Sequence, residues 1–249
     1  MIARWLVASA RLIGCVLCTL HGAVMCVVAL PRMSTAARMA YVGKFSRRML
    51  AVLGIGVSVS GTTPQGGALL VSNHVSWLDI LVMNAVHPTR FVSKSDVRRW
   101  PLLGWMVACG GTLFIERERP RDALRVVHLI AQALTSGDQV SVFPEGTTTD
   151  GHGVLPFHAN LLQAAIVTST PVQPLALRYR DESDAVSVAA AYIGDTTLME
   201  SLWMVVCARG LHADLRWLPS LPSANRERRL LAAELRERIA ETLGATASP

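Results

Sequence analysis

A histidine and an aspartate lie five positions apart in residues 73–79, Asn-His-Val-Ser-Trp-Leu-Asp, directly after an apolar run. A histidine that is oriented by a carboxylate is the usual device for removing a proton from a hydroxyl group. If Asp79 accepts a hydrogen bond from one ring nitrogen of His74, it fixes the tautomer and leaves the other nitrogen as a base. The spacing therefore indicates a proton-transfer pair made of His74 and Asp79.

The same stretch also fits the start of a helix. Ser76 and Asp79 have the spacing of a capping box and precede an apolar run. By this interpretation Asp79 is a helix cap and His74 is an ordinary loop residue. The two interpretations are compatible, because an aspartate in the first helical turn can reach back to the imidazole while Ser76 caps the helix.

A second polar stretch, residues 143–147 with the sequence Phe-Pro-Glu-Gly-Thr, follows another apolar run. Pro144 stops strand pairing, and Gly146 permits an unusual backbone angle or the close approach of a ligand. Taken alone, this stretch fits any strand followed by a turn with a charged tip at Glu145. Two polar stretches that each follow an apolar run suggest two loops at strand ends, meeting over one site.

A third stretch ends in an arginine. Residues 110–117 read Gly-Gly-Thr-Leu-Phe-Ile-Glu-Arg, and an arginine at the end of a strand can bind a phosphate group through paired hydrogen bonds. The alternative is a surface ion pair between Arg117 and Glu116, Glu118 or Asp122. The sequence contains no Gly-x-Ser-x-Gly elbow, Walker loop or dinucleotide fingerprint.

Composition and the remaining polar residues narrow the expected partners. The chain has 249 residues and a net charge of +6, which favours anionic partners. Zinc-finger spacings and RNA-recognition signatures are absent from the sequence, so nucleic acid is not an expected partner. Asp150, His152 and His158 can bind metals, but their spacing matches no standard ligand pattern. We therefore predict neither a metal nor another cofactor.

An apolar segment lies near the N-terminus. Residues 12–30 are apolar except for Thr19 and His21, and Pro31 ends the run. As a helix these residues span roughly 28 Å, close to the hydrocarbon thickness of a bilayer. A buried core helix and a cleaved signal peptide are the alternatives. The sequence leaves open whether the segment spans the membrane or lies in its interface.

Basic residues crowd the far side of this segment and favour a catalytic domain that faces the cytoplasm: Arg32, Arg38, Lys44, Arg47 and Arg48. We predict a membrane-anchoring helical segment at residues 1–48 and a catalytic domain at residues 49–249. The expected location is the inner, cytoplasmic membrane, with membrane lipids as partners.

Apolar runs alternate with helical patterns along the rest of the chain. The expected strands are residues 55–60, 68–72, 90–93, 112–116, 139–143, 172–178, 187–193 and 214–218. The expected helices are residues 35–53, 77–86, 102–108, 121–136, 158–168, 197–209 and 224–243. This alternation predicts an α/β fold in which helices cover a mostly parallel central sheet.

Together, these stretches resemble the glycerolipid acyltransferase family, whose members acylate lysophosphatidic acid and related lysolipids. The family's motifs Asn-His-x-x-x-x-Asp, Phe-Ile-x-Arg and Phe-Pro-Glu-Gly-Thr are matched by residues 73–79, 114–117 and 143–147. A looser fourth motif, an apolar strand with a proline, is matched by residues 172–175. Four motifs in the family's order make the resemblance specific over about residues 69–176.

The resemblance implies that His74 takes the proton from the free hydroxyl of a lysolipid while Asp79 holds the imidazole. The hydroxyl oxygen then attacks the thioester of acyl-carrier protein or acyl-CoA directly, without an acyl-enzyme. The resemblance assigns the binding of the acceptor to four further residues: Arg117, Glu145, Gly146 and Thr147.

One residue departs from the family's pattern. Many members have an arginine after Phe-Pro-Glu-Gly-Thr, where this chain has Thr148, so one potential phosphate contact is missing. The expected acceptor is 1-acyl-sn-glycerol-3-phosphate, which would give phosphatidic acid. Lyso-ornithine lipid, which has no phosphate and is used by some bacterial members, is the alternative. A catalytically silent, membrane-anchored lipid-binding module is the alternative from a different class of protein.

Overall fold

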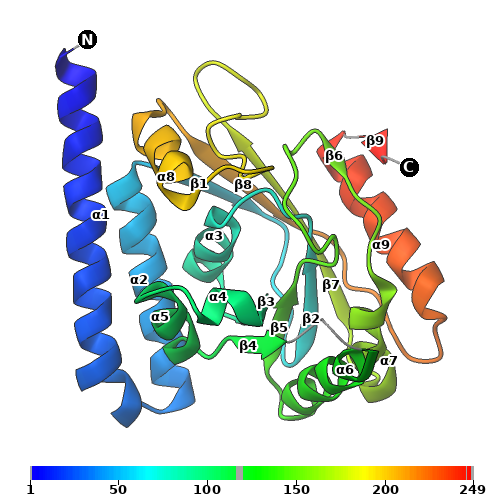
Figure 1. Ribbon diagram of the computed structural model, residues 1–249. Coiled ribbons are helices and arrows are strands. Elements are labelled where there is room, and N and C mark those ends of the chain that lie inside the picture. The colour runs from blue at the N-terminus through cyan, green and yellow to red at the C-terminus, as the bar shows by residue number, and fades with distance from the viewer. Residues whose placement is uncertain (1, 116–119, 245, 248–249) are drawn as a thin grey trace.

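A seven-stranded sheet organises the chain in the computed structural model, which describes residues 2–115, 120–244 and 246–247 (Figure 1). The strands lie in the order β1-β8-β7-β2-β5-β3-β4. Their bounds are β1 Gly56–Ser60, β2 Ala68–Ser72, β3 Arg90–Lys94, β4 Leu113–Ile115, β5 Gln139–Val142, β7 Val172–Arg180 and β8 His212–Trp217. Neighbouring strands are parallel except for β7 and β8. The predicted α/β fold with a mostly parallel sheet is confirmed.

Helices cover both faces of the sheet (Figure 1). One face packs against α2 Thr35–Leu53, α3 Leu78–Val86 and α8 Leu198–Cys207. The other packs against α6 Pro120–Thr135, η2 Ala159–Leu162, α7 Gln163–Thr168 and α9 Arg228–Leu243. Strand β2 is buried on both faces, with Leu70 in the first core and Leu69 and Val71 in the second. A strand buried on both faces reads as a continuous apolar run, which is what precedes the His74 stretch.

The N-terminal segment forms α1 Ile2–Val28, the short 3-10 helix η1 Leu30–Arg32, and then α2. Helix α2 has the predicted bounds. The side chain of Ser34 accepts a hydrogen bond from the N–H of Ala37 at its start, and Gly54 ends it with a φ of 74°. The predicted boundary between residues 48 and 49 lies inside α2, and the division into an anchor and a catalytic domain stays a prediction.

The expected strand at residues 187–193 is wrong. Strand β2 pairs with β7 only as far as Leu175, and beyond that point the side chain of Asn73 bonds the backbone of Leu177. Ser187 donates to the carbonyl of Tyr179 on this edge at 2.9 Å, but the chain then turns away, and the N–H of Tyr192 donates to the carbonyl of Val75 at 3.1 Å. The segment therefore lies against the loop that follows β2.

Smaller differences occur at element ends. The helix expected from residue 224 begins at Arg228, because Asn225 has a φ of 58° and Glu227 caps the first turn. The helix expected at residues 158–168 divides into η2 and α7. Besides η1, the described residues form three short elements that were not expected: α4 Ser95–Arg98 and the strands β6 Gly153–Val154 and β9 Thr246–Ala247, which pair in a sheet of their own.

Candidate active site

His74 and Asp79 meet at the edge of the sheet where the parallel strands end. His74 lies in the loop after β2, and Asp79 is the second residue of α3. Nδ1 of His74 donates to Oδ2 of Asp79 at 2.7 Å. Because a carboxylate only accepts, the proton of the neutral ring lies on Nδ1 and Nε2 carries the lone pair. The His74 side chain keeps 19% exposure, and within the described part of the chain Nε2 has no hydrogen-bond partner.

The Asp79 carboxylate is fully buried and is held on both oxygens. Besides His74, Oδ2 accepts from the backbone N–H groups of Val75 at 2.8 Å and Ser76 at 3.1 Å. Oδ1 accepts from the hydroxyl of Tyr179 at 2.8 Å. These donors fix the plane of the carboxylate and so direct Oδ2 at the imidazole.

The predicted capping role of Ser76 is wrong. Helix α3 begins after Trp77 without a side-chain cap, and within the described residues the buried Ser76 hydroxyl has no hydrogen-bond partner. Only one half of the capping box forms, in which Asp79 accepts from the N–H of Ser76. The other half is missing because the N–H of Asp79 donates to the carbonyl of Ser76 at 3.2 Å and not to its hydroxyl. The predicted reach of Asp79 to the imidazole is confirmed.

The ring of His74 stacks on the ring of Phe143, with centroids 4.0 Å apart and planes 7° apart. Phe143 is itself backed by Phe91, at a centroid distance of 5.8 Å. Stacking on one face and the bond to Asp79 at one edge leave the imidazole a single orientation. The second polar stretch thus reaches the first, as expected of two loops that meet over one site.

Glu145 ties three loop segments together from a buried position. Its Oε1 accepts from the N–H of His74 at 2.7 Å, and its Oε2 accepts from the N–H of Leu155 at 2.8 Å. Burial raises the pKa of Glu145 to about 7, against the lowering effect of these two backbone donors. Both oxygens are occupied by the protein, so Glu145 acts on the site through the backbone of His74.

The residues after Glu145 continue this loop contact. Gly146 turns the chain with a φ of 75°, and Thr147 is exposed at the tip. The Thr148 hydroxyl donates to the carbonyl of Tyr192, and the Thr149 N–H donates to the carbonyl of His74 at 2.9 Å. The side chain of Thr148 is therefore engaged with the segment at residues 187–193.

Two contacts from β7 were not predicted as parts of the site. The side chain of Asn73 bonds the backbone of Leu177 in both directions, each at 2.8 Å, and so extends the sheet by one step. Tyr179, two residues further along β7, bonds Asp79 as described above. One sequence signal could have found Tyr179. It is two and four residues from Leu177 and Leu175 and therefore points to the same face of the strand, at the end where the polar loops lie.

The third predicted stretch is described only in part. Phe114 lies in β4, and the guanidinium of Arg98 lies 5.8 Å from the centroid of its ring. Arg117 lies outside the described residues, so its predicted contact with a phosphate stays a prediction.

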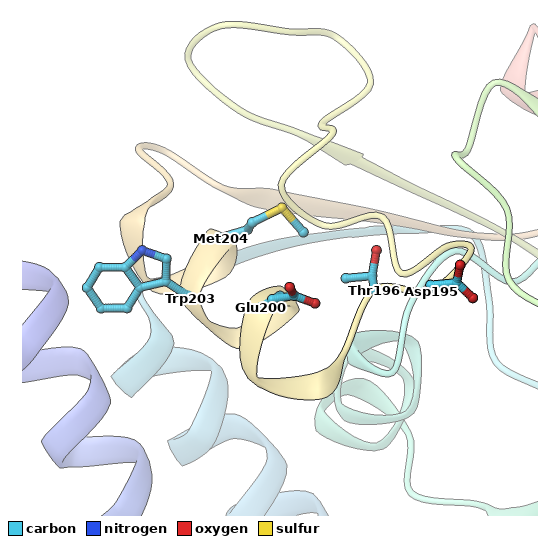
Figure 2. Close-up of a pocket in the computed structure, with 5 residues that line it drawn as sticks. All are labelled: Asp195, Thr196, Glu200, Trp203 and Met204. Carbon is cyan, nitrogen blue, oxygen red and sulfur yellow. The ribbon is translucent and has the colours of Figure 1, made fainter.

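A separate hollow opens on the surface beside α8, lined by Asp195, Thr196, Glu200, Trp203 and Met204 (Figure 2). Trp203 points toward α1, where its ring lies against that of Trp5 at a centroid distance of 5.5 Å (Figure 2). Glu200 forms a capping box with Thr197. The predicted site residues do not line this hollow.

Comparison with known proteins identifies the family. A sequence profile named Acyltransferase matches residues 55–178. The chain is 36% identical over 202 residues to the lyso-ornithine lipid O-acyltransferase of Pseudomonas aeruginosa, which covers 81% of this chain and 78% of that protein. The chain belongs to the Acyltransferase family.

Other acyltransferases and a solved structure agree with this assignment. The 1-acyl-sn-glycerol-3-phosphate acyltransferase of Neisseria meningitidis is 37% identical over 204 residues, covering 81% of this chain and 78% of that protein. The crystal structure of the 1-acyl-sn-glycerophosphate acyltransferase of Thermotoga maritima has the same fold, with a TM-score of 0.70 at 20% identity. That match covers 98% of this chain and 99% of that chain. The family assignment favours an enzyme over the alternative of a catalytically silent binding module.

Proposed function

We propose that this acyltransferase moves a fatty acyl group from an acyl thioester to the free hydroxyl of a lysolipid. The observation that carries the proposal is the His74–Asp79 pair, with Nδ1 bonded to a buried carboxylate and Nε2 left open. A base fixed in one tautomer and one orientation suits the removal of a proton from a hydroxyl group. The thioester donor is acyl-carrier protein or acyl-CoA.

The reaction needs one base and forms no acyl-enzyme. Nε2 of His74 takes the proton of the acceptor hydroxyl as its oxygen attacks the thioester carbonyl. The new C–O bond forms, the C–S bond breaks, and the imidazolium returns the proton to the departing thiolate. Asp79 accepts from Nδ1 throughout and stabilises the positive charge that the ring carries between the two transfers.

For the acceptor we propose 1-acyl-sn-glycerol-3-phosphate, with Arg117 binding the phosphate. The net charge of +6 and the Neisseria relative support an anionic acceptor. One observation favours lyso-ornithine lipid as the second candidate. Thr148 stands where many family members have arginine, and its hydroxyl bonds the carbonyl of Tyr192. The Pseudomonas relative, which is of similar identity, supports this second acceptor.

A matrix of donors and acceptors tests both the proposed reaction and the proposed acceptor. Each of the two lysolipids is incubated with acyl-CoA and with acyl-carrier protein donors of varied chain length, and thiol release is measured with and without acceptor. We expect release to require a lysolipid, and the preferred acceptor to be the phosphate-containing one. The absence of acceptor-dependent release with every lysolipid would rule out the proposed reaction.

His74→Ala tests the assignment of the base. We expect turnover to fall roughly 10²–10⁴-fold, the usual contribution of a general base. His128→Ala is the matched control, because His128 is exposed on α6 on the opposite face of the sheet from α3. Near-normal turnover in purified, folded His74→Ala would show that the base lies elsewhere.

We further propose that the outer face of α1 binds the membrane, at the cytoplasmic side of the inner membrane. An 18-residue window within residues 4–28 has a mean hydropathy of 1.9, and only 17% of that window is buried against the rest of the chain. Six of the ten exposed large apolar side chains described on α1 recur at helical spacing along one face: Leu6, Ile13, Leu17, Leu20, Val24 and Val27. This one-sided apolar stripe suits contact with the acyl chains of a bilayer.

The opposite face of α1 packs on the catalytic domain along most of the helix. Trp5 lies against Trp203 of α8, Arg11 donates to the carbonyls of Val206 at 3.0 Å and Ala208 at 2.9 Å, and Gly22 adjoins Met106 of α5 Leu103–Cys109. A helix that crossed the bilayer in this arrangement would draw α8 and α5 into the hydrocarbon with it. We therefore favour a helix that lies in the interface.

Tags at the two ends of the chain distinguish these orientations. In sealed inside-out vesicles, a helix lying in the interface leaves both tags open to protease. A spanning helix protects the N-terminal tag alone, and that result would contradict the interfacial orientation.

A further inference from the structure

Tyr179 is a buried polar residue that contacts the acid of the His74–Asp79 pair. It is 2% exposed, and its hydroxyl donates to Oδ1 of Asp79 at 2.8 Å. Oδ1 is the oxygen that His74 does not use. Within the described residues no other hydrogen bond reaches Oδ1, whereas Oδ2 accepts three. Removal of the phenol would therefore leave a buried carboxylate oxygen without a donor, which is costly in a protein core.

One strand, β7, sets the positions of both members of the pair. Asn73, the neighbour of His74, is bonded twice to the backbone of Leu177. Tyr179 reaches Asp79 from two residues further along the same strand. The backbone of Tyr179 is fixed in turn, because it pairs with Ala213 of β8 and its carbonyl accepts from the N–H of Ser187 at 2.9 Å.

We infer that Tyr179 is a positioning residue for acyl transfer, which holds the Asp79 carboxylate so that Oδ2 faces Nδ1 of His74. The inference rests on the proposed function of His74 as the base. Tyr179 touches neither substrate; it acts through Asp79, whose plane it fixes by occupying the second oxygen. Without this bond the carboxylate can turn toward other donors, and the imidazole loses part of its orientation.

The hydroxyl is suited to be a permanent donor. Burial, followed by the charge of Asp79 and the hydrogen bond to it, raises the pKa of Tyr179 well above its ordinary value of 10. The phenol therefore keeps its proton over the whole range in which the enzyme is assayed.

Tyr179→Phe removes the hydroxyl and keeps the ring. We expect kcat to fall about tenfold, the effect of losing one hydrogen bond to a charged group, with both KM values within about twofold of wild type. Tyr41→Phe is the matched control. Within the part of the chain that the structure describes, the buried Tyr41 hydroxyl has no hydrogen-bond partner, so its removal should leave kcat unchanged.

A double-mutant cycle separates positioning from a general loss of structure. If Tyr179 acts through His74, Tyr179→Phe should change the residual rate of His74→Ala by less than about twofold. The same tenfold loss in both backgrounds, a raised KM, or an unchanged kcat in Tyr179→Phe would each overturn the inference. Full activity of Tyr179→Phe beside an inactive His74→Ala overturns this inference alone. Equal turnover of wild type and His74→Ala overturns the proposed function, and this inference with it.

Discussion

Glu145→Gln tests whether a buried carboxylate holds the loops of the site together. In the ionised form, both oxygens of Glu145 accept backbone hydrogen bonds, from His74 at 2.7 Å and from Leu155 at 2.8 Å. A protonated carboxyl or a glutamine amide has one good acceptor and turns a donor toward the second N–H group. The variant therefore mimics the protonated form at every pH.

The pKa of Glu145 sets the size of the expected effect on stability. Burial raises this pKa from an ordinary 4.5 to about 7. Each tenfold change in proton affinity corresponds to about 1.4 kcal/mol, so ionisation in the folded protein is about 3 kcal/mol less favourable than in the unfolded chain. Between pH 4.5 and 7 the folded state binds more protons than the unfolded state, so this carboxyl makes stability fall as pH rises through that window.

Thermal melts of the two proteins measure this difference. The other titratable groups are the same in wild type and in Glu145→Gln, so their effects cancel in the difference in stability between the two proteins. Relative to Glu145→Gln, wild type should lose about 2.5 kcal/mol between pH 5 and pH 8, or roughly 5–10 °C in Tm for a chain of this size. Glu237→Gln, at an exposed position on α9, is the control and should follow wild type. A difference in Tm that does not change with pH would refute the buried titration.

Activity should change in the opposite sense, because only the ionised carboxylate accepts from the N–H groups of both His74 and Leu155 and so holds the His74 loop in place. At pH 8 we expect wild type to exceed Glu145→Gln about tenfold, the effect of one hydrogen bond to a charged group. As pH falls to 6, wild-type Glu145 becomes protonated and the ratio should narrow toward one. A constant ratio from pH 6 to pH 8 would show that Glu145 does not act on His74 in this way.

Three further substitutions test neighbouring contacts. Asp79→Asn should lower kcat roughly 10²–10⁴-fold in steady-state assays, because the imidazole loses the charge that orients it. Asn73→Ala should destabilise the protein by about 2–4 kcal/mol in thermal melts, since two buried backbone groups of Leu177 lose their partners. Ser76→Ala should leave Tm and kcat unchanged or slightly raised, because its buried hydroxyl has no hydrogen-bond partner among the described residues. A clear loss of stability in Ser76→Ala would restore the capping role.

Local spacing predicts the bond between His74 and Asp79, because a few residues of loop before a helix keep the two side chains within reach of each other. The same spacing misleads for Ser76. In a capping box the Ser76 side chain would accept from the N–H of Asp79 while the Asp79 carboxylate accepts from the N–H of Ser76. Only the second bond forms, because the N–H of Asp79 donates to the carbonyl of Ser76, and Asp79 accepts in addition from Val75 and the imidazole.

The role of Glu145 depends on contacts that lie far apart in the chain. Its partner His74 is 71 residues away, and the two come together because β2 and β5 are parallel neighbours that end at the same edge. Sequence predicts that both loops contribute to one site. It does not predict that Glu145 is buried there with both oxygens occupied by the backbone.

The segment at residues 187–193 shows the same limit for secondary structure. Its apolar residues favour a strand, but a strand also needs a free edge to pair with, and that depends on the order of the whole sheet. Strand β2 pairs with β7 only as far as Leu175, and the side chain of Asn73 takes the backbone of Leu177 on the edge that remains. The segment meets this edge through the N–H of Ser187, and it then turns toward the loops of the site, where the carbonyl of Tyr192 accepts from Thr148.

The contacts that hold His74 are separate from those that would bind the headgroup of the acceptor. The backbone N–H and carbonyl of His74 are bonded to Glu145 and Thr149, and its Nδ1 and ring face are held by Asp79 and Phe143. The proposed base is thus held in place by the protein alone, so none of the acceptor's binding energy is needed to position it. Contacts to the acceptor headgroup then act mainly on KM, whereas the groups that hold His74 act on kcat. Substitutions around the headgroup should therefore exchange one lysolipid for another without loss of the chemical step.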